Sequence, residues 1–209
     1  MKKKSALKPH IVLFVEGDTD KVFFDALIAY YRKMSQSQLT SNQVVNLKGV
    51  SRYTSKVLGK LENDICPKAS SNGREVKAVF CSYDTDVFEP KGQTLVNWSK
   101  VKRGVQALGI KSFYRIEVRH EMEDWFLDDL PGLCSYLHLS AMPSISGGTG
   151  YEKILSLFKK ANKVYLKGLS VSKFIGSIDM AKIRAMHAKE LKMLEEMLNV
   201  NISQIKNDK

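Results

Sequence analysis

The 209-residue sequence predicts an α/β fold with a mostly parallel, four-stranded sheet flanked by helices. The unbroken apolar run at residues 11–15 is typical of a strand that is buried on both faces. Strand-like and helix-like segments then alternate through Pro131. Because parallel strands need crossover connections, this β-α-β-α order favours a parallel sheet with right-handed crossovers.

Each element has its own local signal in the sequence. Gly17 ends the first strand, and Asp18 or Thr19 is expected to cap the following helix. Strands are expected at residues 11–15, 43–48, 75–83 and 112–118, and helices at 20–34, 51–64, 94–108 and 119–129. Turn-forming residues predict a surface loop at 66–73, and Pro131 is expected to open another short helix.

The composition changes near residue 139, where a loop rich in small residues spans 140–150. The spacing beyond it predicts helices at 151–162, 170–177 and 179–199, the last capped by Ser177 or Asp179. The core face of the last helix should contain Ile183, Met186, Leu191, Leu194 and Leu198. We therefore expect an α/β domain at 1–138 and a helical C-terminal extension at 139–209 packed on it.

Charge is distributed unevenly along this basic chain, whose formal net charge is +11. Residues 1–75 and 150–209 each carry a net charge of +6, whereas residues 76–149 carry −1. A carboxylate-rich centre between basic flanks favours a metal site that faces a phosphate backbone. Charge alone fits a solvated, lysine-rich surface equally well.

The cysteine pattern and the N-terminus exclude several classes of protein. Cys66, Cys81 and Cys134 are scattered and form no C-x-x-C motif, which argues against a zinc site or a disulfide framework. The apolar run after the basic first residues is too short for export or membrane spanning. We therefore expect a cytoplasmic protein without a membrane partner.

Acidic residues follow three of the predicted strands. Carboxyl ends of neighbouring parallel strands lie about 5 Å apart, and carboxylates about that close repel by roughly 4 kcal/mol per pair at an effective dielectric constant of about 20. Gathering them therefore indicates a cation, and oxygen ligands favour Mg²⁺, Mn²⁺ or Ca²⁺. A single Asp-x-Asp is also typical of a plain turn. The acids are Glu16, then Asp84 and Asp86, then Glu117, Glu121, Glu123 and Asp124.

Two of these acidic strand ends resemble the two-part signature of the Toprim fold. The motifs are Phe-Val-Glu-Gly-Asp-Thr-Asp at 14–20 and Phe-Cys-Ser-Tyr-Asp-Thr-Asp at 80–86. The first is most similar to OLD-type (overcoming lysogenization defect) nucleases and to small stand-alone Toprim-like proteins of bacterial defence loci. Residues 118–128 resemble the Glu-x-Trp-(Leu/Phe)-Leu segment of those stand-alone proteins, and 172–179 followed by Arg184 resembles their C-terminal segment.

The resemblance implies a role for each acid of the two motifs. Glu16 matches the Toprim glutamate, a metal ligand or general acid/base. Asp20 matches the second acid of the OLD-like form, and Asp84 and Asp86 match the metal-binding pair. The implied cofactor is Mg²⁺ or Mn²⁺.

Residues later in the chain resemble the corresponding positions of OLD-type enzymes less closely. Glu121 or Glu123 corresponds to the acid that binds a second ion in OLD-type enzymes. Lys173 corresponds to their downstream lysine, which would stabilise transition-state charge on the phosphate. The chain has no room for the tyrosine-bearing domain of resealing Toprim enzymes. It also contains no Gly-x-x-x-x-Gly-Lys-Ser/Thr, so any ATPase would be a separate protein.

The sequence therefore predicts a metal-dependent Toprim nuclease that hydrolyses phosphodiester bonds of nucleic acid, DNA rather than RNA, in defence against phage or mobile elements. The alternatives are a non-catalytic, partner-dependent nucleic-acid-binding subunit and an RNA-processing nuclease. Homo-oligomerisation stays open. The basic residues expected to contact the nucleic-acid backbone, unless they form a plain solvated surface, are Arg119, Lys159, Lys160, Lys163 and Lys167.

Overall fold

A four-stranded parallel sheet forms the centre of the computed structural model, which describes residues 6–35, 38–86, 95–139, 143–201 and 203. Its strands are β1 (Lys8–Val15), β2 (Ser41–Asn46), β3 (Arg74–Asp84) and β4 (Ser112–Val118). They lie in the order β2-β1-β3-β4, and every neighbouring pair is parallel. This arrangement confirms the predicted α/β class.

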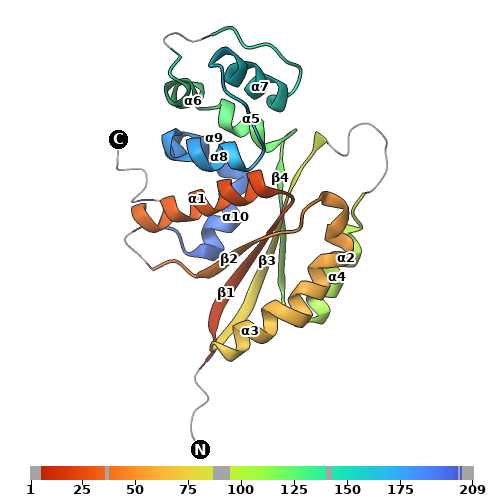
Figure 1. The fold of residues 1–209 in the computed structure, drawn as a ribbon. Helices are drawn as coiled ribbons and strands as arrows, with labels where there is room; N and C mark the ends of the chain where they lie inside the picture. Colours follow the sequence, from red (N-terminus) through yellow and green to blue (C-terminus); the bar gives the residue numbers. More distant parts are fainter. Residues whose placement is uncertain (1–5, 36–37, 87–94, 140–142, 202, 204–209) are drawn as a thin grey trace, which may run out of the picture.

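Helices cover both faces of the sheet and its carboxyl end (Figure 1). One face packs against α1 (Asp18–Met34), α8 (Leu169–Phe174), α9 (Met180–Met186) and α10 (Ala188–Leu198). The other packs against α2 (Tyr53–Lys60), α3 (Cys66–Ser71) and α4 (Trp98–Ala107). Beyond the strand ends lie α5 (Met122–Leu127), α6 (Leu130–Leu137) and α7 (Gly150–Lys160). Single turns lie at Val50–Arg52, Leu61–Ile65 and Ile175–Ser177.

Alternation along β1 divides the apolar residues between two cores. Leu13 and Val15 pack into the core on the α1 side, whereas Val12 and Phe14 pack into the core on the α2 side. Helices α7 to α10 contribute to the first core together with α1 and the sheet. The C-terminal helices therefore share one core with α1 and the sheet. None of the helices in the described ranges is long and apolar enough to cross a membrane.

The predicted loop at 66–73 is wrong over most of its length. Helix α2 continues through a π-helical turn at Leu61–Ile65 into α3, which ends at Ser71. Pro67 lies just after the π-helical turn, and the backbone at Ile65 and Cys66 stays helical. The turn-forming composition therefore did not end the helix.

The single helix predicted at 179–199 is also wrong, because it divides at His187 into α9 and α10. His187 stacks on Trp125, with ring centroids 3.8 Å apart, and its Nε2 lies 2.6 Å from Asp128 Oδ2. The break leaves Met186 57% exposed, so this residue is not part of the core face. Asp179 caps α9 as predicted, because its side chain accepts a hydrogen bond from the Lys182 N–H.

A buried ion pair joins the last helices to α1. Arg184 of α9 donates to Glu195 of α10 from Nε at 2.7 Å and from Nη2 at 2.9 Å. The Tyr31 hydroxyl of α1 donates to the same carboxylate at 2.6 Å. All three side chains are buried, so this network fixes the position of α9 and α10 against the sheet layer.

Candidate metal centre

Residues from the ends of β1, β2 and β3, and from the first turns of α1 and α5, meet in one pocket of about 320 Å³. Parallel strands end at the same edge of a sheet, which explains why residues so distant in sequence converge. The pocket is lined by four carboxylates that the sequence singled out, namely Glu16, Asp20, Asp84 and Glu123. It is also lined by Gly17, Asp18, Thr19, Asn46, Lys48, Gly49, Met122 and Lys167.

Glu16 links the ends of the two central strands. It follows β1 directly, and its Oε1 accepts a hydrogen bond from the Asp84 N–H at the end of β3, 3.1 Å away. The predicted capping of α1 by Asp18 or Thr19 is wrong, because Gly17 is the N-cap residue and no side chain caps the helix. Both candidates bond elsewhere: Asp18 accepts from Asn46 Nδ2, and Thr19 accepts from the Gly168 N–H.

Asp20 and Asp84 each have a carboxylate oxygen that is buried without a hydrogen-bond partner among the described residues, Oδ1 in both cases. Burial is the main cause that raises the pKa of Asp20, and the charge of Glu123 adds to it. Burial also raises the pKa of Asp84, followed by the charges of Asp20 and Glu16. Buried acceptors without a partner are costly, so the site is poorly compensated by the protein alone.

The other two acids of the pocket experience the same environment. Burial, followed by the charge of Asp20, raises the pKa of Glu16 to about 8. Burial also raises the pKa of Glu123, against opposing effects of Lys167 and Tyr165. A set of neighbouring carboxylates with raised pKa values is characteristic of functional sites.

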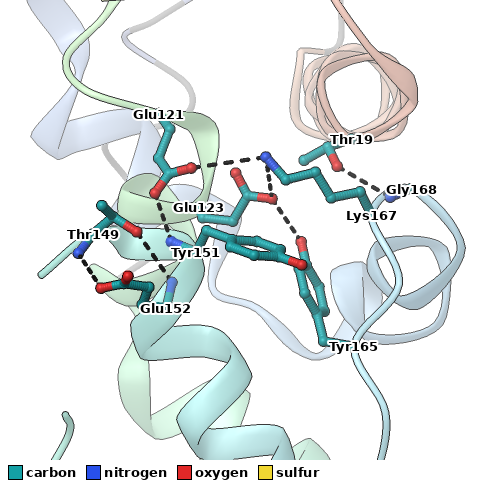
Figure 2. Close-up of polar contacts among 9 residues, drawn as sticks. All are labelled: Thr19, Glu121, Glu123, Thr149, Tyr151, Glu152, Tyr165, Lys167 and Gly168. Atoms are coloured by element: carbon teal, nitrogen blue, oxygen red, sulfur yellow. Dashed lines mark hydrogen bonds and ion pairs between the residues drawn. The ribbon is translucent and has the colours of Figure 1, made fainter. Parts of the chain in front are cut away.

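The positive charge of Lys167 offsets part of the negative charge of this acidic cluster (Figure 2). Its Nζ lies 3.5 Å from Glu123 Oε1 and 3.7 Å from Glu121 Oε2, and 4.9 Å from the centre of the Tyr151 ring. Burial lowers the pKa of Lys167, but the two glutamates outweigh it, so the net shift is upward. The Tyr165 hydroxyl donates to Glu123 at 2.9 Å and fixes that carboxylate.

The loop that carries Lys167 is anchored to α1. The Gly168 N–H donates to Thr19 Oγ1 at 3.0 Å, and the hydroxyl of Ser170 accepts from the Leu166 N–H at 2.8 Å (Figure 2 shows the first of these bonds). Gly168 has φ +71°, and a Cβ there would lie 2.6 Å from Asp18 Cβ. Only glycine therefore allows this loop to approach α1 closely enough to place Lys167 in the pocket.

Glu121 lies beside the pocket rather than in its lining. Its Oε1 accepts a hydrogen bond from the Tyr151 N–H in the first turn of α7, 2.6 Å away (Figure 2). The adjacent glycine-rich loop is closed by Glu152, whose Oε2 accepts from the Gly148 N–H, and Thr149 caps the helix. Glu121 thus joins α5, α7 and Lys167, and Glu123 is the acid of this segment that enters the pocket.

The other predicted site residues lie outside the pocket lining. Asp86 is exposed, and its N–H donates to the His120 carbonyl, although its charge still contributes to the raised pKa values of Glu16 and Asp84. Lys173 is exposed on α8 and does not line the pocket, whereas Lys167 does. Four of the five exposed residues predicted to bind nucleic acid also lie outside the lining, namely Arg119, Lys159, Lys160 and Lys163, whereas Lys167 lines the pocket.

The donor set of the pocket fits a divalent cation. Within the described ranges, no three His, Cys, Asp or Glu side chains are grouped closely enough to hold one ion as they stand. The two buried oxygens without a partner, on Asp20 and Asp84, are hard ligands of the type that Mg²⁺ and Mn²⁺ prefer.

Sequence reasoning missed three residues of the site. Asn46 and Lys48 line the pocket from the end of β2, which carries no acid and therefore gave no signal. Tyr165 is buried in the core and bonds to Glu123 across more than 40 residues of sequence. The glycine after Lys167 was the one local sign that this lysine lies in a constrained loop.

Comparison with solved structures returns C-terminal regions of OLD proteins, the class that the sequence motifs resemble. The region from Burkholderia pseudomallei aligns with 90% of this chain and 98% of its own, with 15% identity and a TM-score of 0.48. The region from Xanthomonas campestris pv. campestris aligns with 89% and 95%, with 15% identity and a TM-score of 0.38. No protein-family model and no curated protein matches the chain. We therefore base the functional proposal on the pocket itself.

Proposed function

We propose that this chain is a divalent-metal-dependent nuclease that hydrolyses phosphodiester bonds of nucleic acid. The observation that carries the proposal is the pair of buried oxygens without a partner on Asp20 and Asp84, in a pocket shared with Glu16 and Glu123. A protein keeps such a costly cluster when a bound cation compensates it. The net charge of +11 supports a polyanionic substrate.

In this proposal, Glu16, Asp20 and Asp84 hold Mg²⁺ or Mn²⁺, with Glu123 beside them. Bound there, such an ion supplies Lewis-acid chemistry, since it polarises a phosphoryl oxygen and makes water a better nucleophile. The protein contributes orientation: the Asp84 N–H fixes Glu16, and the Tyr165 hydroxyl fixes Glu123. The Lys167 ammonium group, held by Glu123 and Glu121, is placed to stabilise negative charge on the phosphate.

DNA is the substrate that we propose first, and defence against phage or mobile elements is the proposed role. The role is motivated by the resemblance of residues 14–20 and 80–86 to stand-alone Toprim-like proteins of defence loci. A separate ATPase is the partner that this resemblance suggests. Exposed Lys159, Lys160, Lys163 and Arg119 are the proposed additional contacts to the nucleic-acid backbone.

The test is a cleavage assay with plasmid DNA, single-stranded DNA and structured RNA in Mn²⁺, Mg²⁺ or EDTA. We expect metal-dependent cleavage that falls at least about 100-fold in Asp84→Asn. The matched control is Glu62→Gln, which removes an exposed acid far along the chain from the pocket and should leave the rate unchanged. Equal rates in Asp84→Asn and wild type would refute the catalytic site. Nucleic-acid binding without cleavage in any metal would instead identify a non-catalytic subunit, and a preference for RNA would identify an RNA-processing enzyme.

A further inference from the structure

The turn after β2 holds Lys48 in a left-handed backbone conformation, with φ 60°. This region is unfavourable for a residue with a long side chain, because Cβ approaches the carbonyl oxygen that follows. Backbone strain of this kind persists only where the surrounding structure imposes it, and it concentrates at functional sites.

Hydrogen bonds on both sides of Lys48 tie the turn to the segment that carries Glu16. The Leu47 N–H donates to the Val15 carbonyl at 2.9 Å, and the Gly49 N–H donates to the Glu16 carbonyl at 2.8 Å. The Lys48 N–H itself donates to Asn46 Oδ1 at 2.7 Å. Asn46 is held in turn, because its Nδ2 donates to Asp18 Oδ1 at 2.7 Å.

Because the turn is anchored in this way, Lys48 lines the carboxylate pocket together with Lys167. The two lysines differ in their partners. Lys167 forms ion pairs with Glu121 and Glu123, so these two glutamates share its charge with any phosphate that it contacts. Lys48 forms no ion pair with any residue that the structure describes, and its side chain is exposed. Its ammonium group is therefore available to a ligand.

We infer that Lys48 binds a phosphate group of the substrate, at the rim of the carboxylate pocket; this inference rests on the proposed function. A phosphodiester that approaches the acidic residues of the pocket meets repulsion, which a free ammonium group in the pocket lining reduces. Lysine serves this purpose as a compact point charge with three donors. The turn fixes the backbone of Lys48 relative to Glu16, so its side chain can place the ammonium group against a phosphate at the rim of the pocket.

The experiment compares Lys48→Met and Lys48→Arg with a matched control, Lys56→Met. Lys56 is an exposed lysine on the following helix α2 and does not line the pocket. Binding of a fluorescein-labelled single-stranded DNA is measured by anisotropy in EDTA, over a range of salt concentrations. Lys48→Met should weaken binding about 10-fold and reduce the salt slope by about 0.7, the value expected for one lost phosphate contact. Lys48→Arg should retain most of the affinity, and Lys56→Met should bind like the wild type.

A second variant, Lys48→Gly, separates the binding role from a structural one. Glycine adopts the left-handed conformation without strain, so this variant should melt about 2 to 4 °C higher, yet it should lose DNA affinity as Lys48→Met does. Wild-type affinity and salt slope in Lys48→Met would overturn the inference, and so would equal losses in Lys56→Met. If the wild-type chain shows no metal-dependent cleavage, the nuclease proposal fails, while the binding comparison still decides the role of Lys48.

Discussion

Replacing Glu16 by glutamine should make the metal-free protein more stable at neutral and higher pH. The glutamine Oε1 can still accept the hydrogen bond from the Asp84 N–H, so the geometry of the two strand ends is kept. What the substitution removes is a carboxyl group whose ionisation the buried acidic cluster opposes. Burial and the charge of Asp20 raise the pKa of this carboxyl group to about 8.

The sign and size of the effect follow from proton linkage. Because the folded pKa of Glu16 is raised above the unfolded value, the folded state binds the proton more tightly. The resulting stability is present at low pH and is lost as the pH rises from the unfolded pKa of 4.5 towards the folded pKa of about 8. Between about pH 5 and about pH 8, the loss is on the order of 3 to 4 kcal/mol for this one group.

Urea denaturation in EDTA at these two pH values measures the effect. Wild type should lose stability as the pH rises, whereas Glu16→Gln should lose markedly less and exceed wild type at the higher pH. The control is Glu62→Gln, an exposed acid, whose pH dependence should match the wild type. The same pH dependence in Glu16→Gln and wild type would show that Glu16 does not lie in a repulsive acidic cluster.

Two further predictions test the contacts that build the site. Gly168→Ala should lower the free energy of unfolding by about 2 kcal/mol or more, because φ is +71° and the new methyl group would lie 2.6 Å from Asp18 Cβ. Thermal denaturation measures this loss. The control is Gly176→Ala, because a Cβ at Gly176 would have no atom within 4 Å. Equal melting temperatures of the two variants would contradict the close approach of Gly168 to Asp18. Glu195→Ala should cost about 3 to 5 kcal/mol, because it leaves Arg184 buried and unpaired. Chemical denaturation measures this cost, and the control is Glu196→Ala at the exposed neighbouring position. A loss below about 1 kcal/mol in Glu195→Ala would contradict the prediction.

Several features were predictable because they depend on local sequence or on sheet topology. The apolar run of β1 and the alternation of segments predicted the parallel sheet, since both follow from burial of the strands. The convergence of Glu16 and Asp84 followed from the rule that parallel strands end at one edge. The structure places both in one pocket, joined by a hydrogen bond. These inferences needed no knowledge of side-chain contacts.

The features that escaped prediction depend on contacts between distant segments. The division of the last helix comes from the stacking of His187 on Trp125, 62 positions away in sequence. Lys167 enters the pocket because Gly168 approaches Asp18, a contact that no periodicity reveals. Lys48 escaped prediction for another reason, because no acidic residue follows β2 and the end of that strand therefore carries no motif.

The most direct test of the account is a Mn²⁺ titration of the purified chain, followed by electron paramagnetic resonance of the free ion. We expect saturable binding to the wild type, weak enough to need a high metal concentration without substrate, and its loss in Asp84→Asn. Bound metal should also raise the melting temperature, with a stabilisation of about 2.7 kcal/mol at 100 times the dissociation constant. Absence of saturable binding, or equal binding by Asp84→Asn, would contradict a metal centre at the shared end of β1 and β3.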